Sequence, residues 1–166
     1  MSDRLITEFL ELVDTPQEMV DISTIASIVW PFAYKNILSQ EQIKYMLDKF
    51  LSVDAIEKAI EDGYRFVLLI DDDKVKMGFI SYKFEDDEIF LSKVYILPNF
   101  QNKGLLKEVI ANLAQFKQNI RLTVNKHNTN AIKAYEHLGF KRIKSVKTDI
   151  GNGFYMDDYV MLLEVK

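Results

Sequence analysis

Apolar residues in the first third of the chain recur at intervals of three and four positions, which predicts amphipathic helices. One helix begins at Thr15, because Pro16 and Glu18 complete a helix start with a capping box, and we expect Pro31 to end it. A second helix starts at Ser39. The expected elements of this part are a strand over 7–13 and helices over 15–29, from 39 onward and over 52–60.

From Tyr64 the pattern changes to short runs of β-branched and aromatic residues, which predict strands. Three such runs are joined by two acidic turns, Asp71–Asp73 and Glu85–Glu88, which indicates a hairpin-rich middle. After Pro98 helices and strands alternate, and the strand–helix–strand unit from Ile89 to Asn125 predicts two parallel neighbours with a right-handed crossover. The expected strands are 64–70, 75–84, 89–97, 120–125, 140–146 and 154–165, and the expected helices are 103–118 and 128–138.

A chain of 166 residues is long enough to bury one core, so we expect a single α/β domain over 1–166. It has no cysteine, which excludes a disulfide scaffold, a thiolate zinc site and a cysteine nucleophile, and only two histidines, so no metal site is expected. The longest strongly apolar run, Phe66–Ile70, is far shorter than the roughly 20 residues of a membrane span. No segment has the character of a signal peptide, and we expect a soluble cytoplasmic protein.

The net charge of −4 hides an uneven distribution. The segment from Lys93 to Lys147 holds eleven Lys and Arg residues against two acidic residues, a net +9. The rest of the chain, with ten basic and twenty-three acidic residues, carries −13. Such asymmetry predicts ligands of opposite sign at the two ends of one site.

Two segments of the basic part carry candidate chemistry. The loop 97–106 joins a strand to a helix, where free backbone N–H groups and the helix dipole suit a phosphate. Gly104 allows the backbone to approach an anion closely, and Lys107 adds positive charge. An ordinary loop with a glycine at a helix start is an equally good interpretation of this segment. The spacing of its residues excludes a Walker loop. In the second segment Asn128 can cap a helix, and Tyr135 lies two turns later near the same face.

These segments resemble the two signatures of the GCN5-related N-acetyltransferase (GNAT) family. The run from Gln101 to Leu106 is similar to the pyrophosphate loop Q/R-x-x-G-x-G/A, with Leu106 where the family prefers Gly or Ala. The second signature matches completely as Asn128-x-x-Ala131-x-x-x-Tyr135-x-x-x-Gly139-Phe140. The resemblance implies a mixed, mostly antiparallel sheet of six to seven strands flanked by helices, with a splayed parallel strand pair that holds the cofactor.

The resemblance also implies acetyl-CoA as the acetyl donor and assigns residues to it. Tyr135 would stand beside the sulfur and protonate the departing thiolate, a role worth roughly 10²–10⁴-fold in rate; the alternative is a core aromatic on an amphipathic helix. One backbone N–H on the fourth strand would polarise the thioester carbonyl. The implied cofactor-binding residues are Val94, Tyr95, Ile96, Gln101, Asn102, Lys103, Gly104, Leu105, Leu106, Asn128 and Tyr135.

The acceptor side is less defined. Residues 33–39 and 154–157 more weakly resemble spermine/spermidine acetyltransferases. This resemblance implies a small primary amine, including a polyamine, as the acceptor. The fourth strand reads Leu91-Ser92-Lys93 without an acid, so the general base stays open. The candidates for the base are Glu88, Tyr82, Asp157, His127 or a water chain, with His137 expected at the surface, and the candidate substrate-binding residues are Trp30, Tyr34, Tyr155 and Asp157.

Two other functions compete with an N-acetyltransferase. Leu106 and the missing acid favour a non-catalytic acyl-CoA sensor or interaction module on the same fold. The net +9 segment suggests nucleic-acid binding, but its lysines are spread over helices and strands without interleaved aromatic residues, so no nucleic-acid partner is expected. No membrane partner is expected either, and a homodimer is possible by analogy with the family.

Overall fold

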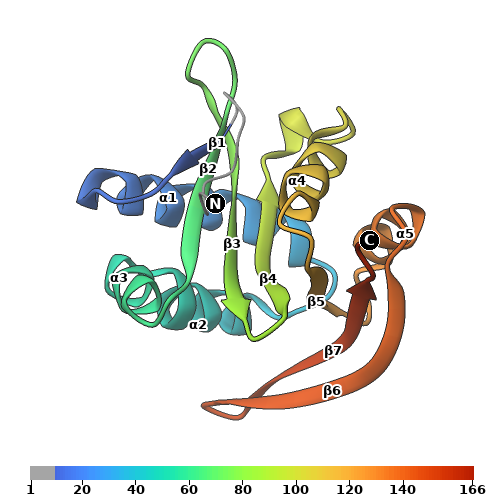
Figure 1. Ribbon diagram of the computed structural model, residues 1–166. Coiled ribbons are helices and arrows are strands. Elements are labelled where there is room, and N and C mark those ends of the chain that lie inside the picture. The colour runs from blue at the N-terminus through green and yellow to red at the C-terminus, as the bar shows by residue number, and fades with distance from the viewer. Residues whose placement is uncertain (1–9) are drawn as a thin grey trace.

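The computed structural model describes residues 10–166, and a single sheet runs through the whole of this part (Figure 1). Its elements are β1 (Leu10–Leu12), α1 (Pro16–Tyr34), α2 (Gln40–Leu51), α3 (Val53–Glu61), β2 (Arg65–Ile70), β3 (Lys76–Glu85), β4 (Glu88–Ile96), a 3-10 turn (Pro98–Phe100), α4 (Leu105–Ala114), β5 (Asn119–Asn125), α5 (Thr129–His137), β6 (Lys141–Gly151) and β7 (Phe154–Leu163). The residues of the expected first strand that precede Leu10 lie outside the described residues.

The seven strands form one sheet in the order β1-β2-β3-β4-β5-β7-β6. Every neighbouring pair is antiparallel except β4 and β5, which run parallel because α4 carries the chain across the sheet between them. The expected mixed, mostly antiparallel sheet flanked by helices, with one parallel pair, is confirmed.

Helices cover both faces of the sheet. Successive residues of a strand point to opposite faces, and β2 shows this clearly: Val67 and Leu69 belong to the core under α4 and α5, whereas Phe66 and Leu68 belong to the core under α1, α2 and α3. Figure 1 shows these two helical layers on either side of the sheet. The run of apolar residues in β2 therefore reflects a strand that is buried on both faces.

The parallel pair separates along its length, and this separation positions the site. The register between the two strands ends at Leu91↔Leu122, although β4 continues to Ile96 and β5 to Asn125. At the same place the pairing of β4 with β3 shifts by one residue, so Ser92 forms a bulge. Bulges increase the local twist and bend a strand. The two strands consequently separate toward their carboxyl ends.

Local signals placed most boundaries, but several expectations were wrong. The strand expected over 140–146 continues to Gly151 as β6, and the helix expected to end at residue 118 ends at Ala114 as α4. Pro31 lies inside α1, which continues to Tyr34. The ring of Trp30, just before the proline, packs 5.5 Å from Tyr34 and 5.3 Å from Tyr95 of β4, so tertiary packing holds the last turn despite the lost backbone hydrogen bond. Helix α4 begins at Leu105 rather than at residue 103, because Gly104 at its N-cap adopts the left-handed conformation with φ 76°. Within residues 10–166, no helix combines the length and apolar character needed to cross a membrane.

Candidate active site

Two cavities meet where β4 and β5 diverge. A groove of about 890 Å³ lies toward the loop before α4 and the start of α5, and a smaller cavity of about 100 Å³ lies toward α1, α2 and β7. We call them the donor groove and the acceptor cavity. Five residues line both of them: Val94, Tyr95, Asn128, Ala131 and Tyr135. A molecule bound in the groove can therefore meet one bound in the cavity at these residues.

The donor groove contains an anion-binding helix start. The N-cap of α4 is Gly104, which has no side chain to satisfy the first N–H groups of the helix. A Cβ built on Gly104 would meet nothing within 4 Å, so the backbone borders open space. Leu106, where the family prefers a smaller residue, packs against the core beneath α4 while it also borders the groove. Unpaired N–H groups, the helix dipole and an open cradle fit a pyrophosphate.

The end of β4 offers backbone groups to the same groove. The N–H of Leu97 donates to the carbonyl of Met77 on β3 at 2.8 Å. Because backbone groups alternate along a strand, those of Val94 and Ile96 face the side from which β5 has withdrawn. The carbonyl of Ile96 accepts a hydrogen bond of 3.1 Å from the side chain of Gln101, which anchors the start of the loop. This edge fits an extended, amide-containing chain such as pantetheine.

Helix α5 positions the residues of the second signature. The side chain of Asn128 accepts a hydrogen bond from the N–H of Ala131 at 3.3 Å and so caps the helix. One helical face then presents Asn128, Ala131 and Tyr135 to both cavities. The cap thereby determines where the helix begins and where its tyrosine lies.

Tyr135 combines a core position with a place in the site. Its side chain is 9% exposed, packs edge-on against Phe140 with ring centroids 5.5 Å apart, and belongs to the core under α4 and α5. Burial, with a smaller contribution from Tyr34, raises the pKa of Tyr135 above its usual value of 10. The phenol is thus fully protonated at neutral pH and available as a proton donor.

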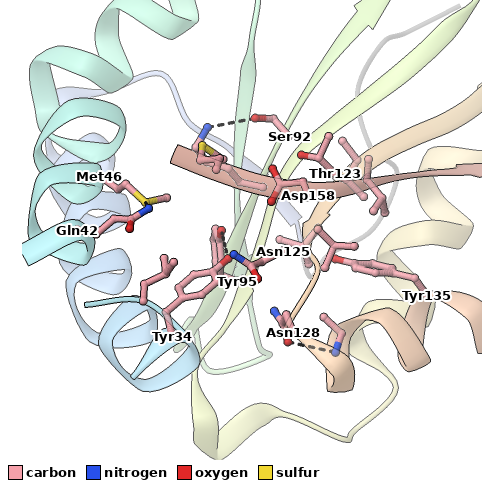
Figure 2. A pocket seen from close by; sticks show the side chains of 18 of the residues that line it. Tyr34, Gln42, Met46, Ser92, Tyr95, Thr123, Asn125, Asn128, Tyr135 and Asp158 are labelled. Atoms are coloured by element: carbon pink, nitrogen blue, oxygen red, sulfur yellow. Dashed lines mark hydrogen bonds between the residues drawn. The ribbon is translucent and has the colours of Figure 1, made fainter. Parts of the chain in front are cut away.

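The acceptor cavity is closed by contacts between distant segments. The hydroxyls of Tyr34 and Tyr95 are 3.1 Å apart and hydrogen-bonded, which joins α1 to β4. The side-chain amide of Gln42 on α2 donates to the carbonyl of Tyr155 on β7 at 2.7 Å. Figure 2 shows Tyr34, Gln42, Tyr95 and Asp158 around the cavity, with Tyr135 approaching it from α5.

Asp158 is the functional candidate that the sequence analysis missed. Its side chain on β7 is 6% exposed and lines the acceptor cavity. Burial raises the pKa of Asp158 to about 6, with a further rise from the charge of Asp157 and an opposing effect of Lys126. The strand pattern contained the signal: the alternate positions Met156 and Val160 are apolar, which places Asp158 on the face that they share.

The neighbouring Asp157 points to the other face of β7. It forms an ion pair of 3.0 Å with Lys126 and does not line the acceptor cavity as the structure describes it. Tyr155 does line the cavity and is 48% exposed. Trp30 is buried behind Tyr34 and Tyr95, so it supports the wall instead of lining it.

The other candidates for a general base lie away from the acceptor cavity. Glu88 pairs with Arg121 at 2.7 Å at the far end of β4. Tyr82 is buried in the core under α4 and α5. His127 is exposed at the rim of the donor groove, and His137 is exposed near the end of α5. Among the described residues of the cavity wall, Asp158 is the one carboxylate.

Comparisons with known proteins agree with this architecture. Residues 34–163 match the family described as Acetyltransferase (GNAT) domain. An uncharacterized N-acetyltransferase of Mycobacterium tuberculosis is 27% identical over 151 residues, which cover 87% of this chain and 96% of the relative.

Solved structures show the same fold. The PaiA N-acetyltransferase of Thermoplasma acidophilum, in complex with coenzyme A, has a TM-score of 0.73 at 20% identity and covers 93% of this chain and 98% of its own. A chimeric form of the spermidine N-acetyltransferase SpeG of Vibrio cholerae has a TM-score of 0.65 at 19% identity, covering 95% and 96%. With its sheet, its divergent strand pair and both signatures in place, the chain belongs to the GNAT family of acetyltransferases.

Proposed function

We propose that the protein transfers the acetyl group of acetyl-CoA directly to a primary amine of a small acceptor. The observation that carries the proposal is the meeting of the donor groove and the acceptor cavity at Tyr135. A direct transfer needs both substrates bound at once, with the reacting atoms at one junction. The two cavities that share one wall supply this arrangement.

The donor would be held mainly by backbone groups. The N–H groups at the start of α4 face the position of an anion, and the free edge of β4 at Val94 and Ile96 suits the amides of a pantetheine arm. Acetyl-CoA supplies an activated thioester carbonyl. An N–H of the same edge is available to stabilise the negative charge that develops on the carbonyl oxygen.

Two side chains supply the proton transfers. Asp158 lines the acceptor cavity with a pKa of about 6, so it is ionised at neutral pH and can take a proton from the ammonium form of the acceptor. The free amine then attacks the thioester carbonyl, the attacking nitrogen releases its remaining extra proton to solvent, and the carbon–sulfur bond breaks. Tyr135 donates its phenolic proton to the departing thiolate, and solvent returns a proton to the phenolate. The products are the N-acetylated amine and free CoA.

A polyamine remains one predicted acceptor class. The carboxylate of Asp158 can receive one ammonium group of such a molecule. The SpeG protein, which shares the fold, is by its name a spermidine N-acetyltransferase, but at 19% identity this likeness extends to the fold alone. The ammonium group of any other primary amine can pair with the carboxylate of Asp158 in the same way.

The test is an acetylation assay with a broad panel of amines, with free CoA detected by a thiol reagent and the acetylated product by mass spectrometry. We expect CoA release that depends on both the protein and an amine. The alternative function, a non-catalytic acyl-CoA sensor, predicts that acetyl-CoA raises the melting temperature while no amine of the panel releases CoA. In that case the Tyr135→Phe variant would also behave like the wild type.

A further inference from the structure

A second charged group lies in the acceptor cavity, and the mechanism above does not use it. Lys93 follows the Ser92 bulge on β4 and lines the cavity. Its ammonium donates a hydrogen bond of 3.1 Å to the hydroxyl of Ser92, drawn in Figure 2. Burial lowers the pKa of Lys93 to about 8, which leaves the side chain mostly charged at neutral pH.

This ammonium has no carboxylate partner among the described residues. The ion pairs in residues 10–166 engage other cations, Lys76, Arg121, Lys126 and Arg142, and none includes Lys93. Lys93 is half-buried, and a charge that is partly withdrawn from water without a counter-ion carries a cost. Such local costs are tolerated where a ligand completes the site.

The cavity is therefore bipolar. Of the residues that line it in the described part of the chain, Lys93 is the one Lys or Arg and Asp158 the one Asp or Glu. They come from β4 and β7, and no ion pair joins them in the part of the chain described here, so each charge is left for a ligand. The remaining polar lining is neutral and includes Gln42, Thr123 and Asn125.

We propose that Lys93 forms an anion subsite and that the acceptor is a small zwitterion, a primary amine that also carries a carboxylate. The inference rests on the proposed acetyl transfer and specifies its substrate class. The amine binds at Asp158, next to the junction with the donor groove, and the carboxylate binds at Lys93 with Ser92 beside it. A cavity of about 100 Å³ suits a short chain between the two groups.

A polyamine fits this cavity less well. It would bring at least two ammonium groups to a wall with one carboxylate, and one of them would face Lys93. Like charges at close range in a poorly solvated site repel strongly. The other acidic residues of the chain do not weaken this repulsion. Of the acidic residues in the described structure, Asp158 alone lines the cavity.

The experiment compares acceptors of equal chain length. Wild-type protein is assayed with 4-aminobutanoate, butylamine and 1,4-diaminobutane, and with the homologues one methylene shorter and longer; O-phosphoethanolamine tests whether phosphate replaces carboxylate. We expect kcat/KM for the best amino carboxylate to exceed that of its matched alkylamine and diamine by at least about tenfold. Equal or better turnover of the alkylamine or diamine overturns the inference but leaves the proposed acetyl transfer standing.

Variants test the residue itself. Lys93→Met should lower the ratio of kcat/KM for the amino carboxylate over the alkylamine at least about tenfold, and Lys93→Arg should retain most of it. Lys144→Met, at an exposed site on β6, is the matched control and should leave the ratio unchanged. Calorimetric titration of amino carboxylates into the CoA-saturated protein adds a readout without turnover. If no amine of any class is acetylated, the proposed function fails. If amino carboxylates bind equally well to the wild type and to Lys93→Met, the anion subsite fails.

Discussion

The hydroxyl groups of Tyr34 and Tyr95 lie 3.1 Å apart and form a hydrogen bond between the end of α1 and the end of β4. Burial raises the pKa of both phenols, so both are protonated at neutral pH and one donates to the other. The pair closes the acceptor cavity beside the junction with the donor groove. It also holds the last turn of α1, beyond Pro31, against the sheet.

We expect Tyr34→Phe and Tyr95→Phe each to lower the free energy of unfolding by about 1 kcal/mol, because each leaves one partly buried hydroxyl without its partner. The double variant should lose less than the sum of the two, since it removes both hydroxyls. Urea unfolding of the four proteins measures this coupling. Strictly additive effects would mean that the hydrogen bond contributes nothing.

Tyr135→Phe should lower kcat at least about tenfold and change the Kd for acetyl-CoA little, because the ring and its contact with Phe140 remain while the proton donor is lost. Steady-state kinetics and calorimetry measure the two effects. Tyr159→Phe is a matched control, since this residue does not line either cavity of the described structure. Unchanged turnover of Tyr135→Phe would remove the residue from the acid role.

The pH dependence of kcat/KM should show a rising limb near pH 6, where Asp158 ionises and becomes able to accept a proton. Asp158→Asn should lose this limb together with most of the activity above pH 6. Asp157→Asn is the neighbouring control: it should keep the limb because its side chain is on the other face of β7, with the midpoint moved to lower pH because the charge of Asp157 raises the pKa of Asp158. A limb that persists in Asp158→Asn would assign it to another group.

The same carboxyl makes a prediction about stability. Its pKa rises from an ordinary value of 3.8 to about 6 on folding, so the folded protein binds the proton more tightly and loses stability as the pH rises through this window. Asp158→Asn should therefore be more stable than the wild type above pH 7, by roughly 2–3 kcal/mol, and equally stable near pH 4. Thermal unfolding at both pH values checks the sign. A destabilised variant at pH 7 would contradict it.

Gly104→Ala should weaken the binding of acetyl-CoA about tenfold, because the methyl group would enter the cradle at the start of α4. The substitution also introduces strain at φ 76°, worth about 1 kcal/mol of stability. Gly153→Ala controls for this strain, since its φ is 79° and its Cβ would likewise meet nothing within 4 Å. Calorimetry should show weaker binding of acetyl-CoA to Gly104→Ala than to Gly153→Ala. Equal affinities of the two variants would argue against an anion site at the start of α4.

Much of the site could be predicted because its two signatures are local. The Gln101–Leu106 loop and the helix start at Asn128 each depend on a few consecutive residues, whose backbone preferences are independent of the rest of the chain. The same is true of the capping box at Thr15 and Glu18. Pro31 shows the limit of such signals, because contacts with β4, distant in sequence, outweigh its local preference.

The alternation of elements, the family and the helix that carries Tyr135 could all be predicted from the chain, since they follow from periodicity, caps and spacing. The charges that line the acceptor cavity depend on the tertiary structure. Lys93 and Asp158 come from strands that are not neighbours in the sheet, and they share a cavity because β4 bulges at Ser92 and separates from β5. Asp157 and Asp158 are adjacent on β7 and point to opposite faces of the strand, so Asp158 lines the cavity whereas Asp157 pairs with Lys126. The alternation along β7 separates the two aspartates by face, but which face borders the cavity, and which residue of β4 lies across from it, depends on strand pairing and packing.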